Sequence, residues 1–329
     1  MAGPTALADP ADLAPWLDAL GLEVGLPLQI EPLSGGTSNL MFTIERGAGD
    51  WVLRRPPQVA LDRADEGMRR EFRILSALEG TPVPHPTPVA LCEDHDVLGC
   101  TFFVMQWVDG VNPIPVPTAL ADETHQTEIT FAMVDALADL HDVDWQAAGL
   151  SDLGHPEQFH ERQVSRWTGQ LASYEGRDLP NVAVVTDWLE SHLPDHFDPT
   201  IMHGDFHMLN ALVAAEPPGR VTAIVDWETA TIGDPLLDLA GFCEVWCSAV
   251  GDGWPSRSEM VERYRERRGL VELPDLMYYE VLYNFRLAVL LEGSYQRSLR
   301  DPSRADRHDI GERALFNAGR AAELVTGSN

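Results

Sequence analysis

A single stretch of the chain carries residues that can accept a proton or hold a metal ion. The segment beginning at Ile201 reads Ile-Met-His-Gly-Asp-Phe-His-Met-Leu-Asn, and Asp226 follows after a short apolar region. Phosphoryl transfer needs one carboxylate that orients a hydroxyl and accepts its proton, together with hard oxygen ligands for magnesium. The residue types therefore predict Asp205 as the catalytic base, and Asn210 and Asp226 as magnesium ligands. We expect His203 to brace the loop by a hydrogen bond.

Two short apolar runs separate the predicted metal ligands in sequence. Residues 211–214 and 221–225 are predicted strands, and Glu216-Pro217-Pro218-Gly219 supplies the turn between them. A hairpin of that length would bring Asp226 back beside Asn210. The alternative is a polar loop whose composition arises by chance, but the whole set at this spacing favours the catalytic interpretation.

The separation of Asp205 and Asn210 equals that of the aspartate and asparagine in the catalytic loop of protein kinases. On these residues the sequence resembles the aminoglycoside phosphotransferase family of small-molecule kinases, which share the protein-kinase fold in reduced form. The resemblance implies ATP and Mg²⁺ as cofactors and a small-molecule hydroxyl as acceptor. The short segment from Glu228 to Leu239 and the glycine at Gly204 lack the features of a phosphorylated activation loop, which also favours a small acceptor.

A glycine-containing turn lies between predicted strands at residues 30–33 and 40–45. Backbone amides can approach phosphate oxygens where no Cβ intervenes, and neighbouring hydroxyls can add hydrogen bonds. An ordinary hairpin turn is the alternative. The predicted nucleotide-binding residues of this turn are Gly35, Gly36, Thr37 and Ser38.

The next predicted strand, residues 51–54, ends in an arginine where kinases carry a lysine that contacts the nucleotide phosphates. All 23 basic residues of the chain are arginines, so Arg54 is the candidate for this role. Glu71, on the predicted helix 65–78, is its candidate partner. The alternatives are that Arg54 is a solvated surface charge and that Glu71 pairs with Arg70 or another helix neighbour.

The remaining pattern predicts a two-lobe fold of the α+β class. Residues 1–106 would form a nucleotide-binding lobe, with a small antiparallel sheet and one key helix. Residues 107–329 would form a mostly helical lobe with the catalytic loop and acceptor site. The backbone of Gln106 and Val108, at the hinge, would contact the adenine. Asp238 is expected to brace the catalytic loop, and His141, at the end of a helix, to be a structural partner or a helix-dipole cation.

Composition limits the other classes of function. The formal net charge of -29 argues against nucleic acid and anionic membrane surfaces as partners, because like charges repel. No apolar run approaches the roughly 20 residues of a membrane helix, and the first residues show no secretory signal, so we expect a cytoplasmic location. The four cysteines, Cys92, Cys100, Cys243 and Cys247, form no Cys-x-x-Cys pair, and the last two are predicted to be packed free thiols.

Within the family, the sequence is similar to a branch related to the kinase-like domain fused to certain acyl-CoA dehydrogenases. That branch carries arginine at the lysine position and implies a hydroxylated acid or its acyl-CoA as acceptor. The residues that carry the resemblance are Val52-Leu53-Arg54-Arg55-Pro56-Pro57, Arg162-Gln163 with Arg166-Trp167, and Phe285-Arg286-Leu287-Ala288 with Glu292-Gly293.

Two other hypotheses stay open at this point. One is phosphorylation of an aminoglycoside or other amino sugar by the same machinery. The other is a catalytically silent module that binds a nucleotide or metabolite, which the arginine at position 54 would favour. The pattern does not set the acceptor, the oligomeric state or the choice between ATP and GTP.

Overall fold

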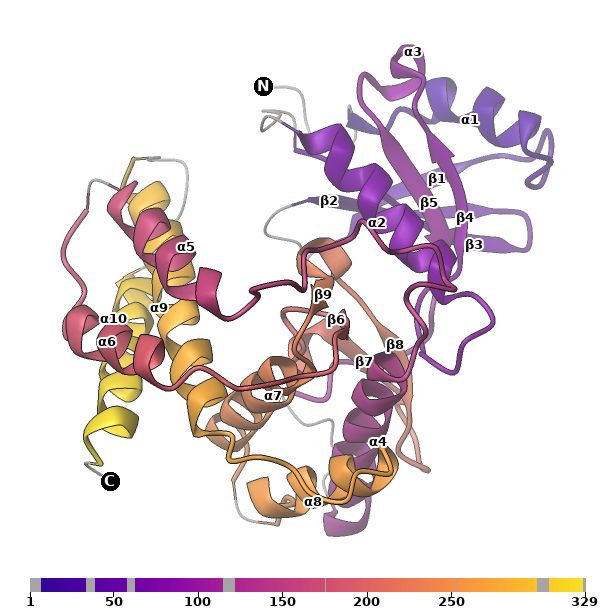
Figure 1. Ribbon diagram of the computed structural model, residues 1–329. Helices are drawn as coiled ribbons and strands as arrows, with labels where there is room; N and C mark the ends of the chain where they lie inside the picture. Colours follow the sequence, from indigo (N-terminus) through magenta and orange to yellow (C-terminus); the bar gives the residue numbers. More distant parts are fainter. Residues whose placement is uncertain are drawn as a thin grey trace. The chain divides into compact units, whose positions relative to one another are not determined.

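The computed structural model describes residues 7–33, 39–57, 63–114, 122–174, 176–251, 253–300 and 308–327. The predicted phosphate-binding turn, Gly35, Gly36, Thr37 and Ser38, lies outside these residues. The chain forms two compact units, coloured by sequence in Figure 1. The first comprises Met1–Ala121, Gln146–Leu150 and Leu209–Thr229, and the second comprises Asp122–Trp145, Ser151–Met208 and Ala230–Asn329. The predicted lobe boundary after residue 106 stays a prediction.

The first unit is built on a five-stranded antiparallel sheet with the strand order β1-β2-β3-β5-β4. Its strands are β1 (Gln29–Leu33), β2 (Leu40–Arg46), β3 (Gly49–Arg55), β4 (Pro88–Cys92) and β5 (Phe102–Gln106). Its helices are α1 (Pro10–Ala19), α2 (Ala64–Leu78) and α3 (His95–Leu98). The unit also contains a hairpin of the strands β7 (Ala211–Val213) and β8 (Val221–Ile224), which is followed by the 3₁₀ turn η4 (Trp227–Thr229). Another 3₁₀ turn, η3 (Met208–Asn210), contains the point where the chain passes from the second unit to the first.

Alternating apolar residues give the sheet a buried face. Phe42 pairs in register with Leu53, and Ile44 pairs with Trp51, so that side chains of β2 and β3 enter one core. Helix α1 adds Leu13 and Leu17 to the same cluster, whereas its C-cap residue, Leu20, is 44% exposed. Each large apolar side chain removed from water contributes roughly 1.5–3 kcal/mol.

Helix α2 presents its apolar face to β4, β5 and η4. Met68, Leu75 and Leu78 recur at helical spacing and are buried, and Phe72 is partly buried. Glu71 shares this buried face and is 3% exposed. A carboxylate in such surroundings requires a partner, because an unpaired buried charge is costly.

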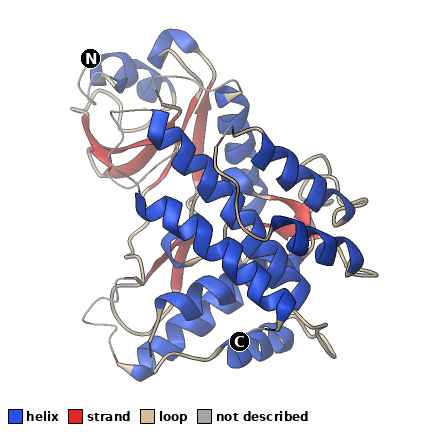
Figure 2. Cartoon of the chain, turned by 90° about the vertical axis from the view of Figure 1, so that its left-hand side faces the viewer, coloured by secondary structure: helices blue, strands red, loops and turns tan. Residues whose placement is uncertain are grey.

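Helices, drawn blue in Figure 2, make up most of the second unit. They are α4 (Glu123–His141), α5 (Glu161–Ala172), α6 (Val182–Ser191), α7 (Pro235–Ala249), α8 (Arg257–Arg267), α9 (Met277–Arg300) and α10 (His308–Thr326). Helix α9 packs against α5, α6, α7 and α10. Two three-residue strands, β6 (Thr200–Met202) and β9 (Thr231–Gly233), pair antiparallel; the sequence did not predict them.

Asp234 sets the start of α7. Its carboxylate accepts a hydrogen bond from the backbone N–H of Leu236 at 3.0 Å, and Pro235 occupies the first helical position, where its missing N–H costs nothing. The other carboxylate oxygen lies 2.9 Å from Nε2 of His160 and accepts the hydroxyl of Tyr279 at 2.9 Å. This buried cap fixes the start of the helix that carries Asp238.

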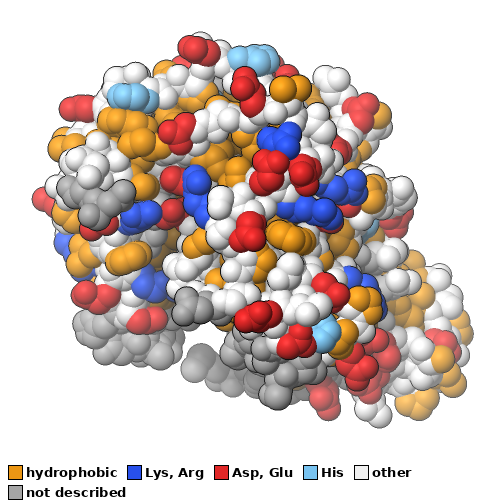
Figure 3. Space-filling view, turned by 90° about the horizontal axis from the view of Figure 1, so that it is seen from below, with side chains coloured by type: hydrophobic (Ala, Val, Ile, Leu, Met, Phe, Trp, Pro, Cys, Tyr) orange, Lys and Arg blue, Asp and Glu red, His pale blue; other side chains and the backbone are white. Residues whose placement is uncertain are grey.

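Acidic side chains are scattered over the visible face in Figure 3, rather than gathered in one patch. This distribution accords with a net charge of -29 spread along the sequence. None of the described helices combines the length and the apolar character needed to cross a bilayer.

Candidate active site

The β7–β8 hairpin places the two predicted metal ligands at its open end. Ala211 pairs with Ile224, and the backbone N–H of Val225 donates to the carbonyl oxygen of Asn210 at 2.9 Å. Asn210 and Asp226 are therefore adjacent, as the hairpin predicted from the sequence requires. Asp226 has a φ angle of 67°, a left-handed conformation that aspartate tolerates better than most residues.

Arg54 lies at the centre of a group of carboxylates in the first unit. Its Nε is 2.8 Å from Oε2 of Glu71, and its Nη2 donates to Oδ1 of Asp226 at 2.7 Å. A third carboxylate oxygen, on Glu228, lies 3.8 Å from the same Nη2. Arg54 is 5% exposed, so the alternative of a solvated surface charge is wrong.

The partner of Glu71 is also settled by this geometry. Glu71 pairs with Arg54, whereas the guanidinium of Arg70 donates to the backbone carbonyl of Glu228 at 3.2 Å. Strand β3 therefore supplies the cation of this group, and helix α2 supplies its buried carboxylate partner. The end of the β7–β8 hairpin supplies the more exposed carboxylate.

Burial and charge oppose each other within this group. Burial, with the nearby charges of Asp226 and Glu228, raises the pKa of Glu71 to about 7, even though Arg54 pulls it down. Burial alone would lower the pKa of Arg54, but the charges of Glu71 and Asp226 outweigh it and raise that pKa. Arg54 thus stays charged, and Glu71 titrates near neutrality.

The loop that carries Asp205 belongs to the second unit. Ile201, just before it, pairs with Ile232 across the β6–β9 ladder. From α7, the carboxylate of Asp238 accepts the backbone N–H of His203 at 2.6 Å and that of Gly204 at 3.0 Å. Asp238 is 4% exposed and therefore braces the loop from inside the unit.

His203 and Arg286 add further contacts to this loop. The imidazole Nδ1 of the fully buried His203 accepts the backbone N–H of Asp205 at 3.3 Å. The guanidinium of Arg286, on α9, donates to the carbonyl oxygen of Gly204. The loop is therefore fixed from two helices and from its own histidine.

Asp205 is held in its ionised form. Burial would raise the pKa of its carboxyl, but the hydrogen bond from His207, with the charges of His207 and Arg286, lowers it to about 2. The Nε2 of His207 lies 3.5 Å from Oδ2 of Asp205. A carboxylate that is ionised at neutral pH and still half-exposed can accept a hydrogen bond from a substrate hydroxyl.

His141 supports Asp238 from the other side. Its Nδ1 lies 2.7 Å from the hydroxyl oxygen of Tyr264, and its Nε2 lies 3.6 Å from Oδ2 of Asp238. Burial lowers the pKa of His141, although the neighbouring carboxylate of Asp238 raises it. These contacts make His141 a structural partner within the second unit.

The predicted hinge residues lie at the end of β5, whose last residue, Gln106, pairs with Trp51, and just beyond it. The backbone N–H of Gln106 donates to the carbonyl oxygen of Thr87 at 2.8 Å, so its amide is already used within the unit. Val108 is half-buried two residues further on. Contacts of Gln106 and Val108 with an adenine stay a prediction.

The donor set in the first unit fits a magnesium-bound nucleotide. Magnesium is usually held by one or two protein oxygen ligands together with waters and phosphate oxygens. Asn210 and Asp226 provide such oxygens, and in the described part of the chain no cluster of three or more histidines, cysteines or acids forms a different metal centre. Arg54 supplies the positive charge that a phosphate requires.

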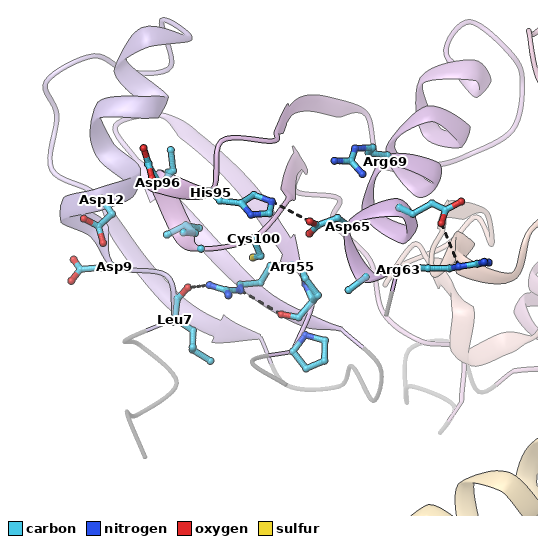
Figure 4. A pocket seen from close by; sticks show the side chains of 17 residues that line it. Leu7, Asp9, Asp12, Arg55, Arg63, Asp65, Arg69, His95, Asp96 and Cys100 are labelled. Carbon is cyan, nitrogen blue, oxygen red and sulfur yellow. Dashed lines mark hydrogen bonds and ion pairs between the residues drawn. The ribbon is translucent and has the colours of Figure 1, made fainter. Parts of the chain in front are cut away.

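A separate pocket of about 870 Å³ lies in the first unit and contains none of the predicted site residues. Figure 4 shows Arg55 within it, bonded to the carbonyl oxygens of Leu7 and Pro56, and His95 paired with Asp65 at 3.0 Å. Arg54 and Arg55 alternate along β3, so their side chains leave the sheet on opposite faces. The pocket is thus distinct from the carboxylate group around Arg54.

Arg286 and His207 are the residues near Asp205 that sequence reasoning did not assign to the site. His207 stands two positions after Asp205, and its proximity to the carboxylate could have been inferred. Arg286 lies 82 positions from Gly204 and reaches the loop only because α9 packs against α7. The sequence signal for Arg286 was that it is a polar residue on an otherwise apolar helix.

Comparison with known proteins decides the family. Residues 29–270 match the model of the family described as "Phosphotransferase enzyme family". The chain belongs to this phosphotransferase family. A crystal structure of a putative aminoglycoside phosphotransferase from Ralstonia eutropha aligns with this family member at a TM-score of 0.84 and 30% identity, covering 98% of this chain and 99% of that one. The GDP complex of aminoglycoside 2'-phosphotransferase-IIIa aligns at 0.65 and 17% identity, covering 95% and 98%, and shares the fold.

Curated relatives of this phosphotransferase are longer proteins. Human acyl-CoA dehydrogenase family member 11 is 32% identical over 299 residues, which cover 86% of this chain and 38% of that protein. The probable acyl-CoA dehydrogenase IBR3 of Arabidopsis thaliana is 32% identical over 327 residues, covering 90% and 39%. The chain thus spans less than two fifths of these relatives.

Family and fold together confirm the α+β, protein-kinase-like class, with its antiparallel sheet and helical part. By its family the chain is a phosphotransferase enzyme, and the nature of its acceptor belongs to the proposed function. The predicted resemblance, including its acyl-CoA dehydrogenase branch, is confirmed.

Proposed function

We propose that the chain transfers the γ-phosphate of ATP, bound with Mg²⁺, to the hydroxyl of a hydroxylated acid or of its acyl-CoA thioester. The relatives that share this domain are named as acyl-CoA dehydrogenases, which supports an acceptor of that class. Arginine at the position of the usual lysine supports the same branch.

The observation that carries the proposal is the buried group around Arg54. Glu71 holds the guanidinium at 2.8 Å, and Asp226 holds it at 2.7 Å. Arg54 would offer its charge to the nucleotide phosphates, while Asn210 and Asp226 would bind the magnesium ion. The metal, when bound, neutralises the charge on the phosphate oxygens.

Asp205 would orient the acceptor hydroxyl and take its proton. With a pKa of about 2 it is a weak base, which suits a loose transition state in which little negative charge develops on the attacking oxygen. Positioning of the hydroxyl by the braced loop would then account for much of the rate enhancement.

Replacement of the base tests this function. Asp205→Asn should lower kcat for a hydroxyacyl-CoA by roughly 10²–10⁴-fold, because the amide cannot accept the proton. Binding of Mg²⁺-ADP should stay unchanged. Asp198→Asn, at a side chain that is 93% exposed, is the matched control. Turnover of Asp205→Asn at the wild-type rate would refute the assignment.

Phosphorylation of an amino sugar is a second candidate, favoured by the likeness to the Ralstonia eutropha protein described as a putative aminoglycoside phosphotransferase. It predicts drug resistance in a susceptible host that expresses the chain. A silent binding module, the third hypothesis, predicts stabilisation by Mg²⁺-ATP without phosphate transfer to any hydroxyl, which a thermal-shift titration paired with product analysis detects.

A further inference from the structure

Two arginines of the second unit lie over one tryptophan, and a third lies one helical turn from the first of them. Arg162 and Arg166 lie one helical turn apart on α5, and Arg286 comes from α9, which packs against α5. The guanidinium carbons of Arg166 and Arg286 lie 4.9 Å and 5.5 Å from the ring centre of Trp167. We call Arg162, Arg166, Arg286 and Trp167 the arginine cluster.

Trp167 is a fixed platform for these cations. Its side chain is buried at 4% exposure, and its indole N–H donates to Oε1 of Gln163 at 3.1 Å. A guanidinium over an indole face is attracted by the ring quadrupole. The ring therefore holds two of the positive charges in place, while Arg162 and Arg166 stay exposed to solvent.

Two guanidiniums of the cluster contact backbone carbonyl oxygens, and the charge of Arg286 also acts on the carboxylate of Asp205. Arg162 contacts the backbone carbonyl oxygens of His155 and Glu157, and Arg286 contacts that of Gly204. Among the residues that the structure describes, none of its three guanidiniums forms an ion pair with a carboxylate. Burial, and then the charges of Arg286 and Arg162, lower the pKa of Arg166, so the three cations repel one another.

Arg177 shows the neutralised arrangement for comparison. It also lies over an aromatic ring, 4.7 Å from the centre of Tyr295, but its guanidinium pairs with the buried carboxylate of Glu292 at 3.1 Å. The chain has 52 acidic residues against 23 arginines, so carboxylates are plentiful. Three guanidiniums that repel one another and pair with no carboxylate among the described residues indicate a binding site for an anion from outside the chain.

We infer that the arginine cluster is a binding subsite for a phosphate group carried by the acceptor, such as the phosphates of a coenzyme A thioester. This inference rests on the proposed function and assigns residues to the acceptor that the function leaves unspecified. Arg286 joins the cluster to the catalytic loop, because its guanidinium donates to the carbonyl oxygen of Gly204.

Phosphate fits the cluster better than a single carboxylate does. One guanidinium satisfies a carboxylate with two parallel hydrogen bonds, whereas three guanidiniums match the higher charge and the additional oxygens of a phosphate.

Calorimetric titration of the full chain with coenzyme A, without ATP, tests the inference. Arg162→Gln and Arg166→Gln should each weaken coenzyme A binding about tenfold, which corresponds to roughly 1.4 kcal/mol. Arg313→Gln, at an exposed arginine of α10, removes the same charge and should change nothing. Arg286 is left intact because it also holds the catalytic loop. Circular dichroism checks that each variant is folded.

The outcomes separate the inference from the proposed function. Equal coenzyme A affinity in wild type, Arg162→Gln and Arg166→Gln overturns the subsite, as does the absence of coenzyme A binding by the wild type. If these two variants bound coenzyme A as tightly as the wild type but bound a free hydroxy acid more weakly, the occupant would be a carboxylate. That result would also overturn the inference. Arginine-dependent binding of coenzyme A, with no phosphorylation of any hydroxyacyl-CoA, would support the subsite and refute the function.

Discussion

Replacement of Arg54 by methionine tests the central ion group most directly. The change removes the charge and keeps much of the side-chain volume. Glu71 is 3% exposed and would be left in the interior without its cation, whereas the side chains of Asp226 and Glu228, each 37% exposed, can regain water. The cost should therefore come mainly from Glu71.

Breaking a buried ion pair by removing one partner typically costs 3–5 kcal/mol. Glu71 already has a pKa of about 7, and loss of Arg54 removes the charge that lowers it, so the carboxyl can escape part of the cost by binding a proton. We therefore expect Arg54→Met to lower the free energy of unfolding by about 3 kcal/mol at pH 7, near the low end of that range.

A double-mutant cycle measured by urea unfolding provides the assay. Arg54→Met combined with Glu71→Gln should cost less than the sum of the two single changes, by roughly 1–3 kcal/mol, because each single change leaves a buried charge unpaired. This coupling energy should shrink at pH 5, where Glu71 is protonated. Arg63→Met, in a pair with Glu66 that is exposed on both sides, is the control and should stay within about 0.5 kcal/mol of wild type. Additive single costs, or a loss below about 1 kcal/mol for Arg54→Met, would contradict this account.

Three further predictions concern pH, the catalytic loop and the thiols. Because burial places the folded pKa of Glu71 at about 7, above the ordinary 4.5, the folded state binds the proton more tightly, and the free energy of unfolding should fall as pH rises from 4.5 to 7. Glu71→Gln should flatten that part of the urea-unfolding profile, and an unchanged slope would count against the shifted pKa. Asp238→Ala leaves the amides of His203 and Gly204 without their acceptor, so it should lower the free energy of unfolding by about 2–3 kcal/mol, against no measurable loss for the exposed control Asp198→Ala. Maleimide should label the exposed Cys247 before Cys243, which is buried and whose pKa burial raises; mass spectrometry showing the reverse order would refute it.

Long periodic elements were predictable from the sequence because their burial pattern is local. Ile129, Met133 and Leu137 recur at helical spacing in α4 and are all fully buried. The β7–β8 hairpin was predictable for the same reason, since a turn sequence separates two short apolar runs. Its geometry then placed Asn210 beside Asp226.

Other features depend on contacts that no local pattern reports. Strands β6 and β9 have three residues each and α3 has four, which is too short for a period to show. Cys243 and Cys247 lie one turn apart on α7, yet only the first is buried, so the prediction that both thiols are packed was wrong for Cys247. The arginine cluster likewise exists only because α9 carries Arg286 back to α5.

The arginine on β3 has a practical consequence for finding enzymes of this kind. Protein kinases carry a lysine on this strand, and its amine is a nucleophile that an acylating nucleotide analogue can modify. Arg54 offers such an analogue no nucleophile, because the carboxylates of Glu71 and Asp226 hold its guanidinium in the protonated state, and the sequence contains no lysine elsewhere. A survey by amine-directed probes will therefore pass over this protein, and reagents aimed at guanidinium groups or at the exposed thiol of Cys247 are the better choice.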